Sequence, residues 1–440
     1  MRKKAIQGIK NSEDLRVNFM LNNMKTNKAY VNFEKKLKKS KKNLFLEELK
    51  NKYHSYRNNW TKNPAISIKN KIYGKNFKKR KFIPLCVDIE TAAVCDLVCP
   101  FCFRQHIVTP DKIMRENLYY KIIDQCSELG VPSIKLNWRG EPLLHPKLPE
   151  FIKYAKDKGI LEVIINTNAV TLTESLSKRI IKSGLDLLIY SFDGGDKETY
   201  EKMRLGRFKK NTFEKVYKNI INFNKVRKKL KSSFPLTKIQ MILTKDNFKV
   251  KKNFFKLFNN IVDDVSVKAY TERGGKLEDI DKSIMDKIKR KIGNKFDEKK
   301  IEHWRDINDN IFVSTKRLPC EQPFQRLLIT YDGAVSMCCY DWGSRYPVGY
   351  IDKQAFISKK DYLDVEKKIK LKKNGFKNFM DGAEMPKLFI HIPKKVQSLY
   401  DIWNGQPINK VRMEHVNNNV NKINVCKKCA FKETYEWKKI

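Results

Sequence analysis

The 440-residue chain lacks long hydrophobic runs and is poor in acidic residues. Its best apolar runs, such as Leu161–Ile165 and Leu185–Tyr190, fall far short of the roughly 18–20 residues that a membrane-spanning helix requires. No apolar segment follows the basic start MRKKAIQGIK, so a secretory signal peptide is not indicated. These absences argue against an integral membrane protein and predict a cytoplasmic location.

The residues that are present suit a folded protein of several domains. Hydrophobic side chains make up 41% of the chain, which is enough for a core despite 32% charged residues. The formal net charge of +43 suggests nucleic acid or an anionic surface as a partner. However, 74 of the 92 basic residues are Lys, whereas phosphate and base recognition tends to use Arg. Because AT-biased coding also produces a Lys-rich chain, the sequence allows a nucleic-acid partner but does not favour one.

Residues 1–82 are expected to form a basic, mainly helical N-terminal extension. They hold 24 basic and five acidic residues. The stretch 34–53 has a helical pattern, and its apolar stripe consists of Phe45, Leu46 and Leu49. The aromatic and basic stretch that follows predicts that Tyr56 and Trp60 pack against the main body. The alternative interpretation is RNA binding through this basic and aromatic mixture.

Residues 83–270 alternate between short β-rich runs and helical stretches, which predicts an α/β fold with parallel strands. Only a helical crossover returns the chain to the same edge of a sheet. The pattern fits either an open barrel or a doubly wound sheet. The expected strands are Leu85–Glu90, Ser133–Trp138, Leu161–Asn166, Asp186–Ser191, Thr237–Leu243 and Asp264–Ala269, and the expected helices lie near 112–129, 147–158, 173–183, 196–229 and 247–260.

The rest of the chain predicts a second, smaller unit. Residues 271–310 are charged with a mostly helical pattern, and we assign them to the core domain, 83–310. From about residue 311 two short β runs surround a turn at Asp332-Gly333, which predicts a hairpin in a C-terminal domain, 311–440. Within it, the Lys-rich residues 351–400 are interpreted as an insertion.

Three cysteines lie on the loop after the first expected strand: Cys95, Cys99 and Cys102. Structural zinc sites and ordinary iron–sulfur clusters use four protein ligands. Three thiolates therefore leave one coordination position open for chemistry. The alternative is a zinc site completed by His106.

Polar residues follow the next strands where each of them ends. Because the carboxyl ends of parallel strands meet at one mouth, these residues should share a site with the cysteine loop. They are Gly140 and Glu141 after the second strand, Asn166 and Asn168 at the third, and Ser191 and Asp193 at the fourth.

The motif CDLVCPFC at 95–102, with GEP at 140–142, resembles the radical SAM superfamily over residues 83–270. The resemblance implies a partial (β/α)6 TIM-like barrel whose three cysteines bind a [4Fe–4S] cluster. That cluster binds S-adenosylmethionine and cleaves it to a 5′-deoxyadenosyl radical, which abstracts hydrogen from substrate. In this sequence Arg139 stands where the family usually has Gly. The implied cofactor contacts are Phe101 near the adenine, Gly140-Glu141 at the amino group, Ser191 and Asp193 at the ribose, Arg204 at the carboxylate and Gln240 on the fifth strand, with Asn166 and Asn168 in the same set.

Five further cysteines follow residue 300: Cys320, the pair Cys338-Cys339, and Cys426 and Cys429. Four thiolates make a closed site, and their spacing alone fits zinc or a [4Fe–4S] cluster equally well. The segments LLITYDGAVSMCCYD (327–341) and LYDIWN (399–404), with the terminal CxxC, resemble the SPASM/twitch domain. That resemblance implies one auxiliary [4Fe–4S] cluster on Cys320, Cys338, Cys426 and Cys429 in a small α+β domain. Cys339 is spare or replaces Cys338, while Cys86 and Cys126 are expected in the core.

These resemblances imply a radical SAM enzyme that oxidises or epimerises a small molecule, such as a carbohydrate, using an electron donor such as flavodoxin or ferredoxin. A helical extension, rather than a winged helix that binds a leader peptide, favours a small substrate. The alternatives are a peptide maturase, an RNA-modifying enzyme of the same family and, outside enzymes, a basic zinc-containing nucleic-acid-binding protein. No catalytic base is assigned, since His145 and Glu141 both have ordinary structural explanations.

Overall fold

The computed structural model describes residues 39–106, 109–244, 246–270, 289–291, 303–306, 308, 310–344, 346–357, 395–427, 429, 431 and 434–440. Three regions of the sequence analysis therefore fall wholly or mostly outside the described residues: the first part of the N-terminal extension, the charged stretch 271–310 and the Lys-rich insertion. The side chains of Phe45, Leu46 and His106 are also outside them.

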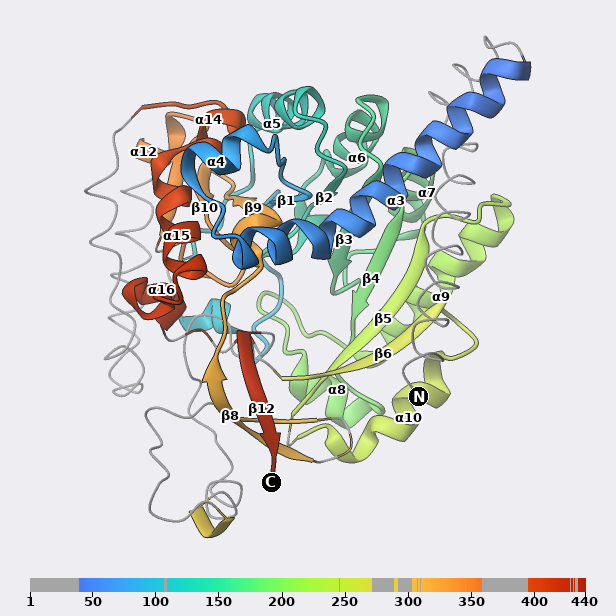
Figure 1. Cartoon of the computed structure of the whole chain (residues 1–440). Coiled ribbons are helices and arrows are strands. Elements are labelled where there is room, and N and C mark those ends of the chain that lie inside the picture. Colours follow the sequence, from blue (N-terminus) through green and yellow to red (C-terminus); the bar gives the residue numbers. More distant parts are fainter. Residues whose placement is uncertain are drawn as a thin grey trace.

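A nine-stranded sheet forms the centre of the molecule, in the order β11-β10-β9-β1-β2-β3-β4-β5-β6 (Figure 1). Strands β1 to β6 are all parallel and neighbour one another in chain order, which confirms the α/β prediction. All six expected strands are present. They are β1 (Cys86–Ile89), β2 (Ser133–Lys135), β3 (Glu162–Thr167), β4 (Leu187–Ser191), β5 (Leu236–Leu243) and β6 (Asp264–Ala269).

Helices connect these strands and cover the sheet, and their amphipathic sequences place the apolar side against it. The stretch 196–229, expected as one helix, is two helices, because the chain turns at Arg204 and Asn211 bonds back to the Arg204 carbonyl (2.9 Å). The connecting helices are α5 (Glu116–Glu128), α6 (Leu148–Asp157), α7 (Glu174–Ser183), α8 (Lys197–Met203), α9 (Phe213–Lys229) and α10 (Lys251–Phe258), with the short turns η1 (Phe103–His106), η2 (Pro142–Leu144) and η3 (Phe248–Val250).

The expected hairpin is present, and it extends the same sheet. Strand β9 (Arg326–Ile329) pairs in parallel with β1, and β10 (Ala334–Ser336) and β11 (Pro347–Tyr350) continue antiparallel. Gly333 occupies the turn with φ +94°, a conformation that favours glycine. The region after residue 311 is thus joined to the core through backbone hydrogen bonds. Its helices and turns are η5 (Gln322–Phe324), α12 (Gln354–Ile357), α14 (Leu399–Asn404), α15 (Gln406–Val416), η8 (Val420–Lys422) and α16 (Asn424–Lys427).

A second, three-stranded sheet lies apart from the first and contains β7 (His303–Arg305), β8 (Ile311–Arg317) and β12 (Tyr435–Lys439). Its strands are antiparallel. The helical expectation for 271–310 is wrong at residues 303–305, because β7 pairs with β8 and tertiary pairing outweighs local pattern.

The N-terminal extension is helical where it is described. Helix α3 (Lys39–Lys69) continues through Pro64, and α4 (Gly74–Lys79) follows. Tyr53 and Tyr56 of α3 are buried with Leu85 and Leu161, which precede β1 and β3. This confirms the expected packing against the main body, at the amino ends of the strands. Buried Tyr53 and Tyr56 are not available to stack on RNA bases.

No helix in the described part of the chain has the length and apolar character needed to cross a membrane.

Candidate functional site

The first cysteine loop follows β1 and is held by the segment that follows α8. The Val98 N–H donates to the Leu205 carbonyl (2.8 Å), and the Arg207 N–H donates to the Asp96 carbonyl (2.8 Å). Arg207 also binds Asp111 through two nitrogens, both at 2.7 Å. Cys99 is buried, and Cys95 and Cys102 are half-buried. Backbone contacts to a distant segment thus fix this loop.

Arg204, at the end of α8, brings positive charge to the loop. Its Nη1 lies 3.8 Å from the Cys99 Sγ, and its guanidinium group lies over the Phe101 ring. Arg204 forms an ion pair with Asp193, whose Oδ1 also accepts from the Ile242 N–H (2.6 Å). Burial raises the pKa of Asp193, and Arg204 opposes that shift. Asp193 therefore holds Arg204 in place, and the expected ribose contact of Asp193 stays a prediction.

Gly140 and Glu141 lie directly against the cysteine loop. A Cβ on Gly140 would be 2.3 Å from the Ala92 carbonyl oxygen and 2.4 Å from that of Val94, so only glycine allows this approach. The Glu141 carboxylate accepts from Thr167 Oγ1 and the Asn168 N–H, both at 2.7 Å, and from the Leu143 N–H at 3.0 Å. Burial, with a contribution from the negative charge of Asp96, raises the pKa of Glu141 to about 7. The two sequence motifs therefore form one structural unit.

Several buried acceptors at this edge have no hydrogen-bond partner among the described residues: Asn166 Oδ1, Gln240 Oε1 and Asp96 Oδ2. Asn168 joins them through its amide, which donates to Asp96 Oδ1 (2.7 Å). Ser191 is half-buried at the end of β4, directly opposite Gln240 on β5. Buried acceptors normally find a partner, so this edge is suited to a ligand that carries amino or hydroxyl groups.

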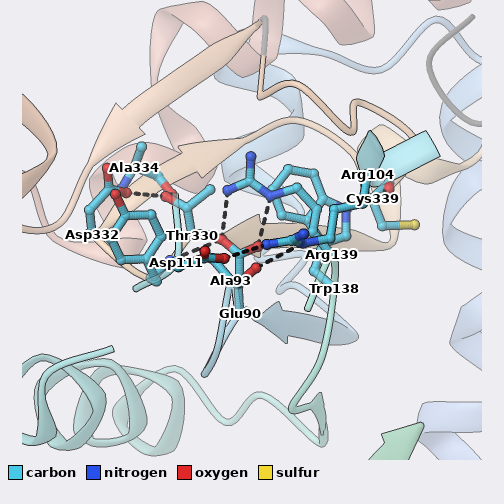
Figure 2. Close-up of polar contacts among 11 residues, drawn as sticks. Glu90, Ala93, Arg104, Asp111, Trp138, Arg139, Thr330, Asp332, Ala334 and Cys339 are labelled. Carbon is cyan, nitrogen blue, oxygen red and sulfur yellow. Dashed lines mark hydrogen bonds and ion pairs between the residues drawn. The ribbon is translucent and has the colours of Figure 1, made fainter. Parts of the chain in front are cut away.

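A buried ion pair that sequence reasoning missed lies beside the site (Figure 2). Arg139 binds Glu90 with Nε–Oε1 at 2.7 Å and Nη2–Oε2 at 2.8 Å, and neither side chain is exposed. The only indication of this ion pair in the sequence was Arg139 itself, which stands where the radical SAM superfamily usually has glycine. Its partner was not identifiable, because Glu90 lies 49 residues earlier.

The five later cysteines gather near Arg317, although they come from distant parts of the chain. Burial, followed by the negative charge of neighbouring thiolates, raises the pKa of Cys320, Cys426 and Cys429. For Cys338 the pKa is raised first by a hydrogen bond with Cys339 and then by burial. For Cys320 the pKa rises to about 12. The structure therefore brings the expected auxiliary ligands together, with Cys339 among them.

Polar side chains hold these cysteines by their backbone and their sulfur atoms. Arg317 donates to the carbonyls of Cys426 (3.0 Å) and Cys429 (3.4 Å). The Cys320 N–H donates to Nδ1 of buried His415 (3.0 Å), and burial lowers the pKa of that ring to about 4. Arg326 Nη1 lies 3.7 Å from the Cys339 Sγ. The neighbouring Cys338 Sγ accepts from the Tyr340 N–H at 3.3 Å, so both sulfur atoms of the adjacent pair have polar partners.

The donor set of both sites is rich in sulfur, which fits iron–sulfur groups. Within the described residues, no three His, Cys, Asp or Glu side chains converge on a point that could hold a single metal ion. Cys86 and Cys126 are buried, and Cys126 belongs to the main core, as expected.

Comparison with known families adds to this geometry. The sequence model of the radical SAM superfamily matches residues 89–243, and that of an iron–sulfur cluster-binding domain, SPASM, matches residues 320–371. The chain contains a radical SAM domain followed by a SPASM domain. A radical SAM domain implies a [4Fe–4S] cluster and S-adenosylmethionine, and a SPASM domain implies auxiliary iron–sulfur binding.

Individual relatives of this radical SAM chain match over short stretches. A cofactor-modifying protein for tungsten-containing aldehyde ferredoxin oxidoreductase from Pyrococcus furiosus is 28% identical over 165 residues, 37% of this chain and 44% of that protein. GTP 3′,8-cyclase of Chlorobaculum tepidum is 32% identical over 30% of this chain and 38% of its own. PqqA peptide cyclase of Granulibacter bethesdensis is 31% identical over 27% and 32%, respectively. The chain spans less than half the length of each of these curated relatives.

Solved structures match more of the chain at lower identity. SuiB of Streptococcus suis, bound to its precursor peptide SuiA, has a TM-score of 0.49 and 15% identity over 81% of this chain and 78% of SuiB. BtrN in complex with AdoMet and 2-DOIA has a TM-score of 0.41 and 15% identity over 79% of this chain and 93% of BtrN.

Proposed function

We propose that the chain is a radical SAM enzyme that cleaves S-adenosylmethionine reductively and abstracts hydrogen from a small-molecule substrate, such as a carbohydrate, in an oxidation or an epimerisation. One observation carries the proposal: the three-cysteine loop packs directly on Gly140, at an edge where buried acceptors lack partners among the described residues. Parallel α/β folds place their binding sites at this edge.

Cys95, Cys99 and Cys102 would hold the first iron–sulfur group, and Cys320, Cys338, Cys426 and Cys429 the auxiliary one. When bound, these groups and S-adenosylmethionine supply one-electron chemistry that the side chains cannot perform. The chain's own residues orient and shield the site. Gly140 permits the backbone carbonyls of Ala92 and Val94 to approach closely. Burial raises the pKa of the Cys99 thiol, and the positive charge of Arg204 lowers it. Asn166 Oδ1 and Gln240 Oε1, which have no hydrogen-bond partner among the described residues, are placed to receive donor groups of a ligand.

A peptide substrate is the second candidate. The similarity to PqqA peptide cyclase over 121 residues supports it. Against it stands the N-terminal region, because the described part, α3 and α4, is helical and packs on the core. A leader-binding winged helix would instead require strands.

The test is anaerobic reconstitution with iron and sulfide, followed by reduction with S-adenosylmethionine and chromatography for 5′-deoxyadenosine. Two [4Fe–4S] groups correspond to about eight iron atoms and eight sulfides per chain. The Cys99→Ala variant should form no product, because it removes a ligand of the reactive group. The Cys426→Ala variant should keep the cleavage of S-adenosylmethionine and lose substrate turnover.

The matched control is Cys126→Ala, a buried core cysteine of helix α5, which should keep both iron content and cleavage. Bound zinc without sulfide would contradict the proposal. Equal loss of cleavage in Cys99→Ala and Cys426→Ala would contradict the division between the two sites. Small molecules and peptides would then be compared as substrates by their ability to raise 5′-deoxyadenosine yield.

A further inference from the structure

Two adjacent residues after β2, Trp138 and Arg139, link the two cysteine regions. Figure 2 shows them with Glu90 and Cys339. The Trp138 indole N–H donates to the carbonyl of Cys339 at 2.9 Å. The Arg139 guanidinium lies 4.2 Å from the centre of the Trp138 ring and pairs with Glu90. A strand end of the radical SAM domain thus reaches a residue of the auxiliary cysteine set 201 positions later.

Glu90 carries the same connection through its carboxylate. It immediately follows β1 and lies five residues before Cys95. Its Oε2 accepts from Arg139 and also from the Tyr331 N–H (3.3 Å), in the turn between β9 and β10. One fully buried carboxylate therefore joins the start of the first cysteine loop, the residues after β2, and the β9–β10 hairpin that precedes Cys338 and Cys339. A buried ion pair gives little net stability over apolar packing, so its specific geometry is the feature to explain.

Trp138 also belongs to the apolar cluster between the two regions. This cluster contains Trp138, Phe103, Leu328 and Trp342, and Cys102 packs against it. The Trp138 side chain consequently shares this cluster with Cys102, the third cysteine of the first loop, while its N–H holds the backbone of Cys339. It is 7% exposed, so water competes little for this hydrogen bond.

We propose that Trp138 and Arg139 are positioning residues that couple the two cysteine sites, so that β2 sets the geometry and the electronic environment of the auxiliary site. Hydrogen bonds and solvent exposure around an iron–sulfur group set its reduction potential, and residues behind the ligands tune metal sites in general. The expected effect on the reduction potential of the auxiliary cluster rests on the proposed function. The hydrogen bond from Trp138 to the Cys339 carbonyl does not, because it forms without any bound cluster.

The test compares Trp138→Phe with Trp403→Phe in the full-length chain. Both substitutions keep an aromatic ring and remove one buried indole hydrogen bond, which in Trp403 is donated to the Phe82 carbonyl (2.7 Å). The first readout is hydrogen–deuterium exchange of residues 331–344 in protein without iron. Loss of one hydrogen bond in Trp138→Phe should speed exchange there by about three- to tenfold. Trp403→Phe should leave this segment unchanged.

The second readout is the midpoint potential of the auxiliary cluster, followed by electron paramagnetic resonance with the first cluster as internal reference. Trp138→Phe should change the ratio of reduced to oxidised auxiliary cluster at a fixed potential by up to about tenfold, or about 59 mV for one electron. Arg139→Lys keeps the positive charge but loses the bidentate hydrogen bonding to Glu90. It should shift both readouts in the same direction as Trp138→Phe.

Unchanged exchange and unchanged potential in both variants would overturn the coupling. Changes of the same size in Trp403→Phe would also overturn it, because the effect would then be a general response to losing an indole. If the chain takes up no iron and sulfide, the proposed function fails, and the exchange measurement alone decides whether Trp138 holds the auxiliary loop.

Discussion

The first cysteine site takes its three thiols from one loop of eight residues, whereas the second collects its thiols from segments that span 110 residues. Arginines contact both sites, and two of them, Arg204 and Arg317, act differently. Arg204 is buried, pairs with Asp193 and faces the Cys99 sulfur. Arg317 is half-buried and binds the backbone carbonyls of Cys426 and Cys429.

This difference follows from how each site is assembled. A short loop already holds its cysteines together, so Arg204 is available to act on sulfur charge. Thiols from distant segments must first be brought to one place, and carbonyl contacts such as those of Arg317 fasten the chain itself. Arg204 therefore acts mainly through its charge. Arg317 also lowers the pKa of Cys320, Cys426 and Cys429, and it adds hydrogen bonds to the backbone that carries two of these cysteines.

The strongest way to break this comparison is to make the same substitution at both arginines. Arg204→Met should lower the free energy of unfolding by about 3–5 kcal/mol, because it leaves the fully buried Asp193 carboxylate without its cation. Arg317→Met removes hydrogen bonds to neutral groups, the carbonyls of Cys426 and Cys429 and the Thr434 hydroxyl, and a contact with the Tyr435 ring, and leaves no carboxylate unpaired. It should cost about 1.5–3 kcal/mol. Urea unfolding of the two variants, prepared in parallel, measures both values. Equal costs, or the reverse order, would show that the two arginines do not differ in this way.

The sequence revealed those parts of the molecule that depend on local pattern. The six parallel strands follow from alternating runs, and the three cysteines of the first loop were found because their spacing is short. The SPASM cysteines were recognised from the CxxC and the residues around Cys338, although their convergence required the fold. Spacing and pattern are properties of the sequence, so they can be recognised without a structure.

The parts that were missed depend on pairs far apart in sequence. The β1–β9 pairing joins residues about 240 positions apart, and neither strand carries a sign of its partner. The Arg139–Glu90 ion pair and the Trp138–Cys339 hydrogen bond are of the same kind. Asp193 was interpreted as a ligand contact because it ends a strand, whereas its nearest cation, Arg204, can be assigned only when α8 is in place.

A glycine in each region offers the second test. Gly140→Ala would place a Cβ against two backbone carbonyls, which cannot move without shifting the cysteine loop. A displacement of about 1 Å at a reacting centre can cost about 10²-fold in rate, so 5′-deoxyadenosine formation should fall by about that factor. Gly349→Ala would meet the buried Ile402 side chain in the C-terminal region, away from the first cysteine loop, so it should disturb the core there and leave cleavage unchanged. Equal loss in both variants would mean that the close contact at Gly140 has no special role.

The smallest expected effect comes from acid, which should loosen each region through its own buried histidine, His145 in the first and His415 in the second. The ring links the segment after Glu141 to Met114: the Lys147 N–H donates to Nδ1 (3.2 Å), so Nε2 carries the hydrogen that the Met114 carbonyl accepts (2.8 Å). Burial lowers the pKa of His145, against opposing contributions from the Met114 carbonyl and from Glu116 and Glu150.

Because the folded pKa of His145 lies below the unfolded value of about 6.5, the unfolded chain binds more protons in acid, and stability falls as pH drops through and below that value. Protonated Nδ1 would also face the Lys147 N–H as a second donor. Between pH 7.5 and 5.5, hydrogen exchange of residues 138–147 should therefore rise. Exchange of residues 318–322 should rise as well, because the Cys320 N–H donates to His415, whose pKa is lowered to about 4. His145→Gln, which cannot take up a proton, should remove the rise at residues 138–147 and leave the rise at residues 318–322. If the pH dependence of residues 138–147 persists in His145→Gln, another group controls it.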